Sequence, residues 1–195
     1  MMTAELKSPQ RDPRTNSFHP LKFAMWLGIA AIIMLFAALT SAYIVSEGQG
    51  KLGHLSLPKI FWFNTAVILA SSAAMQWTVS AFKKYNRNMY RTGLAATFLL
   101  GVTFLIGQYI GWWQMPSLKE GFSKVVASDY VFVISSVHAA HIAGGLLIML
   151  VTLAKSFFQP FNPNKLVNVQ IMATYWHFVD VLWIYLFIFF QINLA

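Results

Sequence analysis

The sequence predicts an all-α, polytopic membrane protein with a bundle of five transmembrane helices, and three observations support this prediction. Hydrophobic residues make up 57% of the 195 residues and charged residues only 10%, whereas a soluble domain carries about 25% charged residues. Five apolar stretches of about 25 residues or slightly more contain almost no charge. At ~1.5 Å of rise per residue each reaches roughly 37 Å, enough to cross a ~30 Å hydrocarbon core. The period-2 alternation of a membrane β-barrel is missing, so helices must satisfy the backbone in lipid.

The apolar stretches follow a polar N-terminal arm, residues 1–21, which contains three prolines and is expected to be extended. The first stretch is too long for the core of a cleavable signal peptide, so we expect it to remain as an anchor. Residues 22–195 then form one transmembrane domain. Its predicted helices are residues 22–46, 58–82, 90–115, 128–156 and 168–193.

The basic residues predict the orientation of the domain in the membrane. Ten of the 14 Lys and Arg residues lie in the N-terminal arm and in the second and fourth connections with their flanks, and four lie on the opposite side. By the positive-inside rule the N-terminus is cytoplasmic and, with an odd number of spans, the C-terminus is outside. The four on the opposite side are Lys51, Lys59, Lys119 and Lys124.

Composition excludes several classes of function. The chain has no cysteine, which removes disulfide frameworks, thiolate metal sites and cysteine nucleophiles. Its net charge of +8 comes from basic residues dispersed over short connections, whereas a nucleic-acid-binding protein gathers them on one face. No nucleic acid partner is therefore expected.

Small and amide side chains indicate where the helices approach each other closely. Gly107 and Gly111 form a GxxxG pattern in the third helix, and Gly144 ends a small-residue stripe in the fourth. We interpret these glycines as helix-packing positions. Gln108, beside Gly107, is the best candidate for a packed polar contact between helices.

The candidate site is a layer of ionisable residues deep in the last two helices: His138, His141, His177 and Asp180. Such groups are costly to insert and are a functional hypothesis by default. His141 and Asp180 each lie about 18 Å along their antiparallel helices, near the middle of the membrane. Each pair has i, i+3 spacing and so shares a helical face. We therefore expect a hydrogen-bond network between the two helices, direct or through one water.

Three interpretations of this layer compete. A metal or b-type haem site requires pairing of an imidazole of the fourth helix with His177. A proton or ion path requires relay groups spaced through ~30 Å, whereas these groups collect in one layer. The interpretation that we favour is structural: His and Asp satisfy one another and fix the helix register. It assigns no catalytic, metal-binding or cofactor-binding residue to the chain.

Four segments resemble the haem-copper oxidase subunit III family, and together they cover nearly the whole chain from Lys22 onward. YWHFVDVLWIYLF at residues 175–187 resembles the signature of that family, and HAAHIAGGL at residues 138–146 is similar to its H-x-x-H helix. The segments GVTFLIGQYIGW, residues 101–112, and WLGIAAIIMLFAALTSAYIV, residues 26–45, resemble its earlier helices. The five spans resemble the short bacterial form of a family whose longer members have seven helices.

The resemblance implies a subunit of a terminal respiratory oxidase, cytochrome c oxidase, in the bacterial cytoplasmic (inner) membrane. It implies subunit I as the main partner, with haems and copper in partner subunits and none in this chain, which then has no catalytic centre of its own. It also implies bound phospholipid and support of oxygen reduction coupled to proton translocation. The four polar-layer residues become structural or lipid-proximal.

Two positions depart from the family pattern. Family members often carry a Glu in the first of these helices, where this chain has Ile32, and another in the third, where it has Gly111. A role for those carboxylates in proton uptake does not transfer to this chain. Subunit III of a quinol oxidase remains an alternative, as do a standalone b-type cytochrome and a small transporter.

Overall fold

The computed structural model describes residues 20–49, 57–115, 126–158 and 166–193. The helices within these ranges are α1 (Pro20–Gly48), α2 (Ile60–Lys83), α3 (Arg87–Trp113), α5 (Val126–Phe158) and α6 (Leu166–Asn193). All five are long and apolar enough to cross a membrane, which confirms the predicted all-α class with five spans. Each helix begins and ends within three residues of its expected range. Residues 1–19 of the predicted N-terminal arm and most of the connections, with Lys51, Lys119 and Lys124, lie outside the described residues, and the last two residues of that arm, Pro20 and Leu21, begin α1 instead.

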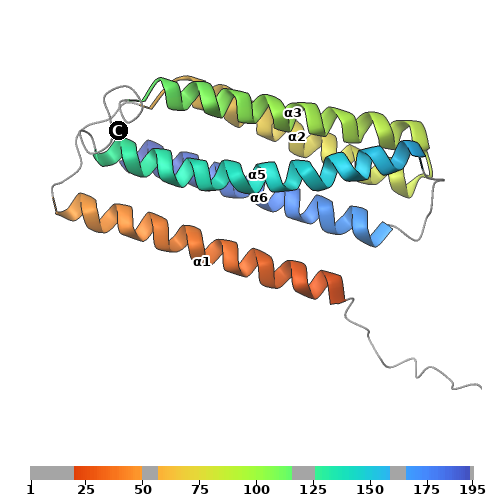
Figure 1. The fold of residues 1–195 in the computed structure, drawn as a ribbon, viewed down its shortest axis with the longest axis horizontal. Coiled ribbons are helices and arrows are strands. Elements are labelled where there is room, and N and C mark those ends of the chain that lie inside the picture. The colour runs from red at the N-terminus through yellow and green to blue at the C-terminus, as the bar shows by residue number, and fades with distance from the viewer. Residues whose placement is uncertain (1–19, 50–56, 116–125, 159–165, 194–195) are drawn as a thin grey trace, which may run out of the picture.

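Successive helices run antiparallel along one long bundle (Figure 1). We call the end at which α1, α3 and α6 begin, and α2 and α5 end, the N-terminal face. A turn at this face joins α2 to α3, in which Tyr85 has a φ of 56° and the Asn86 side chain accepts a hydrogen bond of 3.1 Å from the Met89 amide. That hydrogen bond caps α3. Whether this face is cytoplasmic stays a prediction from the basic residues.

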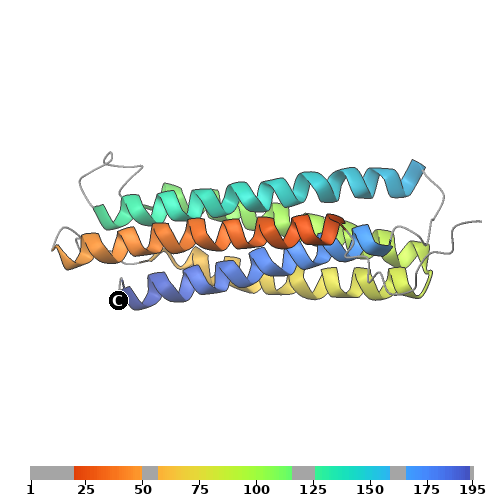
Figure 2. The same ribbon diagram turned by 90° about the horizontal axis from the view of Figure 1, so that it is seen from below.

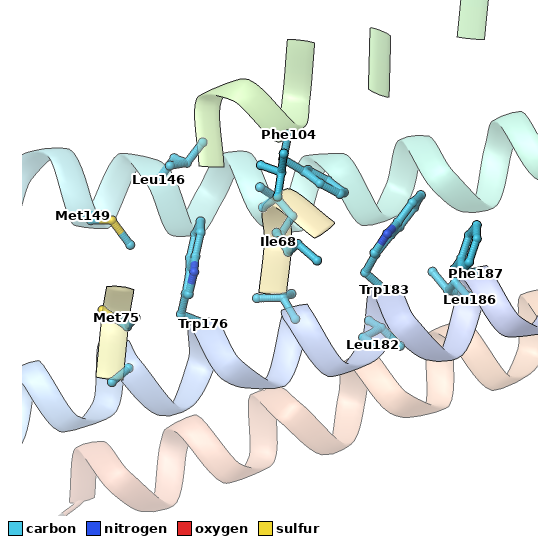
Figure 3. Close-up of a cluster of buried hydrophobic side chains, with 14 of the residues drawn as sticks. Ile68, Met75, Phe104, Leu146, Met149, Trp176, Leu182, Trp183, Leu186 and Phe187 are labelled. Carbon is cyan, nitrogen blue, oxygen red and sulfur yellow. The ribbon is translucent and has the colours of Figure 1, made fainter. Parts of the chain in front are cut away.

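The core lies between α2, α3, α5 and α6, where large side chains interdigitate. Trp176 and Trp183 of α6 are fully buried, and both project from α6 toward α5 (Figure 3). Phe104 of α3 meets Trp183 edge to face, with 5.1 Å between the ring centroids. Because lipid is as apolar as a leucine side chain, close packing and interhelical hydrogen bonds hold these helices together.

α1 lies along one side of the bundle, against α5 and α6 (Figures 1 and 2). Its buried residues form one narrow stripe: Ile29, Phe36, Thr40 and Tyr43. The hydrogen bonds and ring contacts that attach it come from its C-terminal half. Ser46 and Tyr130 share a hydrogen bond of 2.7 Å between their hydroxyls, and the Tyr43 hydroxyl donates to the carbonyl of Asn193. The N-terminal half of α1 instead borders two hollows at the N-terminal face.

Candidate functional site

The four predicted residues lie in the middle of α5 and α6 and differ in burial. His138 is fully buried and Asp180 is 2% exposed, while His141 and His177 are half-buried. Each i, i+3 pair shares a helical face as expected. The two pairs, however, bond to different neighbours.

His138 lies in an aromatic box that three other helices supply. Its ring stacks on Trp183 of α6 with 5.3 Å between the centroids. Phe36 of α1 and Phe104 of α3 meet it edge to face at 6.2 and 6.0 Å. Neither ring nitrogen has a hydrogen-bond partner among the described residues. This imidazole is therefore held by its faces and edges, as a phenyl ring would be.

His141 bonds within its own helix. Its Nδ1 lies 2.8 Å from the carbonyl oxygen of Val137, so Nδ1 carries the proton and donates. The link from this residue to α6 runs through the backbone, because the Tyr175 hydroxyl donates to the His141 carbonyl at 3.0 Å. The ring itself packs against Phe36 at 5.7 Å.

The α6 pair bonds toward α2. Nδ1 of His177 lies 2.6 Å from Oγ of Ser72. Neither oxygen of the Asp180 carboxyl reaches a partner at hydrogen-bond distance and angle among the described residues. Nε2 of His177 is buried and has no partner among the described residues.

No direct hydrogen bond therefore joins the α5 pair to the α6 pair within the described part of the chain. Trp176 and Trp183 project from α6 toward α5 (Figure 3), and the Trp183 ring stacks on His138 of α5. The water-mediated form of the network stays a prediction. Across the described ranges, no three His, Cys, Asp or Glu side chains come together as a metal site does.

Sequence reasoning missed the hydrogen bonds that fix these tryptophans. Nε1 of Trp176 donates to Ser71 at 2.9 Å, and Nε1 of Trp183 donates to Thr65 at 3.1 Å. The signal was present, because Trp176 and Trp183 are seven residues apart on α6 and Thr65 and Ser71 six apart on the antiparallel α2. About two helical turns separate the two tryptophans on α6, and about two turns separate their two partners on α2. The two hydrogen bonds therefore join α6 to α2 at two levels of the bundle.

The packing positions in α3 are occupied as closely as a GxxxG pattern implies. A Cβ atom at Gly107 would lie 2.0 Å from Oδ1 of Asn64, and one at Gly111 would lie 2.5 Å from the Phe61 ring. Asn64 donates to Oε1 of Gln108 at 3.1 Å, which confirms the interhelical contact expected for Gln108. In α5 the structure differs from the expectation for Gly144. A Cβ there would meet nothing within 4 Å, and the neighbouring Gly145 is the position that packs on Trp176 and Tyr175.

The N-terminal face carries a groove of about 830 Å³ lined chiefly by α1, α5 and α6, with Phe82 of α2 and Tyr90 of α3. Its walls are mostly apolar, with Leu21, Met25, Val151 and Met172 among them, and Arg87 and Lys155 also line it.

Two arginines of α3 cap the C-terminal end of α5 beside this groove. Arg87 donates to the Ser156 carbonyl at 3.1 Å. Arg91 donates to the same carbonyl through Nε and Nη2 and lies 4.5 Å over the Phe157 ring. The last carbonyls of a helix have no intrahelical partner. The two arginines donate hydrogen bonds to these carbonyls of α5, and their positive charges interact favourably with the negative end of the helix dipole.

The sequence matches the family described as cytochrome c oxidase subunit III over residues 14–193. The chain belongs to the cytochrome c oxidase subunit III family. Among its relatives is cytochrome c oxidase subunit 3 of Corynebacterium diphtheriae, which is 29% identical, with 94% of this chain and 93% of that protein aligned. Another is cytochrome c oxidase subunit 3 of Papio hamadryas, 28% identical over 86% of this chain and 67% of the relative.

A further relative is named as a subunit of a second type of oxidase. Cytochrome bo(3) ubiquinol oxidase subunit 3 of Buchnera aphidicola is 25% identical, with 90% of this chain and 92% of that protein aligned. Membership of the subunit III family, together with five membrane-spanning helices, makes this chain a multi-pass membrane subunit of an oxidase that has other oxidase subunits as partners.

Proposed function

We propose that this chain is the non-redox subunit III of a bacterial cytochrome c oxidase and supports the haem-copper subunit I in the cytoplasmic membrane. The family match over residues 14–193 carries this proposal. The polar layer agrees with a subunit that holds no redox centre, because His138 is enclosed by aromatic rings and His177 bonds to a serine. The chain then contributes packing and lipid binding, and the partner performs the oxygen chemistry.

The groove at the N-terminal face supports the lipid-binding part of this proposal. Its mostly apolar walls suit acyl chains, and Arg87 and Lys155 among its lining residues suit an anionic phosphate. Arg87 is also tied to the end of α5, so its guanidinium is held in place. A phospholipid seated here would join α1 to the rest of the bundle where direct contacts are sparse.

Purification of the tagged full chain from native membranes tests the assembly. We expect a haem-copper subunit to co-purify in a fixed ratio, and the separated chain to show no Soret absorption of its own. Isolation of the chain without oxidase subunits, or with haem bound to it, would contradict the proposal.

Lipid extraction from the purified complex tests the groove: Lys155→Glu should lower the phospholipid retained, while the exposed Lys84→Glu, outside the groove, should not.

Subunit III of a quinol oxidase is the second candidate, and the Buchnera aphidicola relative supports it. The purified complex distinguishes the two by its electron donor. We expect it to oxidise reduced cytochrome c. Oxidation of ubiquinol without oxidation of cytochrome c would assign it to the quinol branch.

A further inference from the structure

The second hollow at the N-terminal face lies between α1 and α2 and has a volume of about 340 Å³. α6 packs against both α1 and α2, whereas α1 and α2 do not contact each other within the described ranges, and they lie on either side of α6 (Figure 1). The two helices therefore form the sides of the hollow, and α6 lies between them. We call it the polar hollow.

Polar side chains make up much of the lining of the polar hollow. On α2, Gln76 and Lys83 are seven residues apart, and on α6, Gln170 and Thr174 are four apart. Both spacings keep the two members of a pair on one helical face. α1 contributes Lys22. Each of the three helices thus turns hydrogen-bonding groups toward the same space.

These side chains begin at the helix ends and reach the depth that hydrocarbon occupies. Lys83 is the last residue of α2, and Lys22 is the third of α1. At ~1.5 Å per residue, Gln76 lies roughly 7 Å from the middle of α2 and Thr174 roughly 8 Å from the middle of α6, whereas the hydrocarbon core extends ~15 Å to either side of its midplane. Gln76 is nonetheless exposed, and Thr174 is half-buried. Polar groups at this depth are costly in lipid and bond favourably to another helix.

The lining also has unused hydrogen-bonding capacity. Within the described part of the chain, no hydrogen bond or ion pair reaches the side-chain amides of Gln76 and Gln170 or the ammonium groups of Lys22 and Lys83. An amide donates two hydrogen bonds and accepts two, and an ammonium group donates three. No described acidic residue lines the hollow. An occupant that complements it therefore brings a carboxylate or another anion, together with hydrogen-bonding groups that reach deeper.

Beyond the polar hollow, an apolar strip continues along the same three helices toward the opposite face. Leu69 lies two turns past Gln76 on α2, and Val181 lies two turns past Thr174 on α6. On α1, Ile33 lies three turns past the lysine that lines the hollow. All three apolar side chains are more than half exposed. The surface is thus polar toward the N-terminal face and apolar further in, over the length of a helix contact.

We propose that the polar hollow and the apolar strip beyond it form the docking surface for a transmembrane helix of a partner oxidase subunit. The helix that fits carries an Asp or Glu near its end at the N-terminal face, between Lys22 and Lys83. About two turns further in, it carries a Ser, Thr, Asn or Gln that bonds to Gln76 and Thr174, and apolar residues follow. This inference rests on the proposed assembly into an oxidase and adds the surface and the chemistry of the contact.

A phospholipid complements only part of this surface. Its phosphate would meet Lys22 and Lys83 at the helix ends, as at the other groove. Its acyl chains would then lie against the amide of Gln76 and the hydroxyl of Thr174, which have no use for apolar neighbours. A protein helix supplies hydrogen-bonding groups at both levels, so the depth of the polar lining favours a helix over a lipid.

Photocrosslinking of the full chain in its native membranes tests the occupant. A benzophenone amino acid replaces Trp26, which lines the hollow and is 60% exposed. Trp77 of α2 is the matched control, because it is 48% exposed and lies outside the lining. Both replacements exchange one large aromatic side chain for another. Mass spectrometry then identifies the crosslinked peptide or lipid.

We expect the group at position 26 to join one transmembrane segment of an oxidase subunit, with a yield about fivefold or more above that at position 77, because only groups in contact react. The segment should contain the acidic and polar residues two turns apart. Lipid adducts alone, a crosslink to a second copy of this chain, or equal partner yields at the two positions would overturn the docking surface. If oxidase subunits co-purify but do not crosslink, the proposed function stands and this inference fails. If none co-purifies, both fail.

A charge reversal at the helix end tests the ionic contact in the purified complex. Lys83→Glu should weaken binding of the labelled chain to the remaining oxidase subunits in detergent by about tenfold or more, because two like charges then meet. The adjacent, exposed Lys84→Glu lies outside the lining and should change the dissociation constant less than about twofold. Circular dichroism checks that both variants keep their helices. Equal dissociation constants for the two variants would refute the ionic contact.

Gln76→Leu tests the deeper contact. Loss of one interhelical hydrogen bond in a membrane should weaken the same binding roughly threefold. If lipid covers Gln76, the leucine suits that environment better and the dissociation constant stays unchanged, which would contradict a docked helix. Exchange of the crosslinked partner's acidic residue for Lys, combined with Lys83→Glu, should restore binding, and its failure to do so would refute the pairing.

Discussion

The two histidine pairs share one spacing and nearly one depth, yet they occupy opposite environments. On α5, the ring of His138 is enclosed by Phe36, Phe104 and Trp183. On α6, His177 bonds to Ser72 and lines a hollow of about 340 Å³ between α1, α2 and α6. The pair spacing is the same, so the difference comes from what the neighbouring helices present.

Trp176 and Trp183 create this separation. Both rings project from α6 toward α5 (Figure 3), and hydrogen bonds to Ser71 and Thr65 of α2 fix their indole nitrogens. The Trp183 ring stacks on His138, so this ring stands between that imidazole and the backbone of α6. An aromatic partition therefore divides the midplane into a dry side around His138 and a polar side around His177.

The sharpest way to break the comparison is to change His138. His138→Ala should destabilise the full chain by roughly 2 to 5 kcal/mol, because it leaves a cavity in a closely packed box. His138→Phe should be close to neutral, since the ring stacking is kept and two unpaired nitrogens are removed. Equilibrium unfolding in mixed detergent micelles measures both. A loss in His138→Phe as large as in His138→Ala would show that the imidazole nitrogens have partners, such as the predicted bridging water.

The partition itself can be displaced from α3. A Cβ at Gly101 would lie 2.8 Å from Leu146 and 2.9 Å from the Trp176 ring, so Gly101→Leu must push the indole away. Overpacking of this kind costs about 1 to 3 kcal/mol, measured by the same unfolding assay. Gly144→Leu is the control, because its Cβ would meet nothing within 4 Å and its effect should stay within about 0.5 kcal/mol. Equal stability of the two variants would mean that Trp176 moves freely.

The sequence was sufficient for the spans, for the depth of the polar layer and for the close approach at Gly107 and Gly111, because apolar length and small-residue spacing are local properties. It did not predict how each helix is rotated about its axis. A spacing of three residues shows that His138 and His141 share a face, but not which neighbour that face meets. The choice of Gly145 over Gly144 as the packed position depends on the same rotation, which the bulk of Trp176 sets.

Ser72 offers the smallest change, and it acts on the polar side alone. Ser72→Ala removes the hydrogen bond to Nδ1 of His177 and should cost about 0.5 to 1.5 kcal/mol. Ser136→Ala should cost less, because among the described residues the Ser136 hydroxyl donates to the Val133 carbonyl of its own helix and to no other helix. If water from the hollow that His177 lines can take the place of the lost hydroxyl at Nδ1, the measured cost falls at the lower end of this range. If the polar side is dry, the imidazole loses its only described partner, and the cost exceeds the range. The unfolding free energy of one serine variant thus distinguishes a wet from a dry environment around His177, while the same measurement on His138→Phe does so for the other pair.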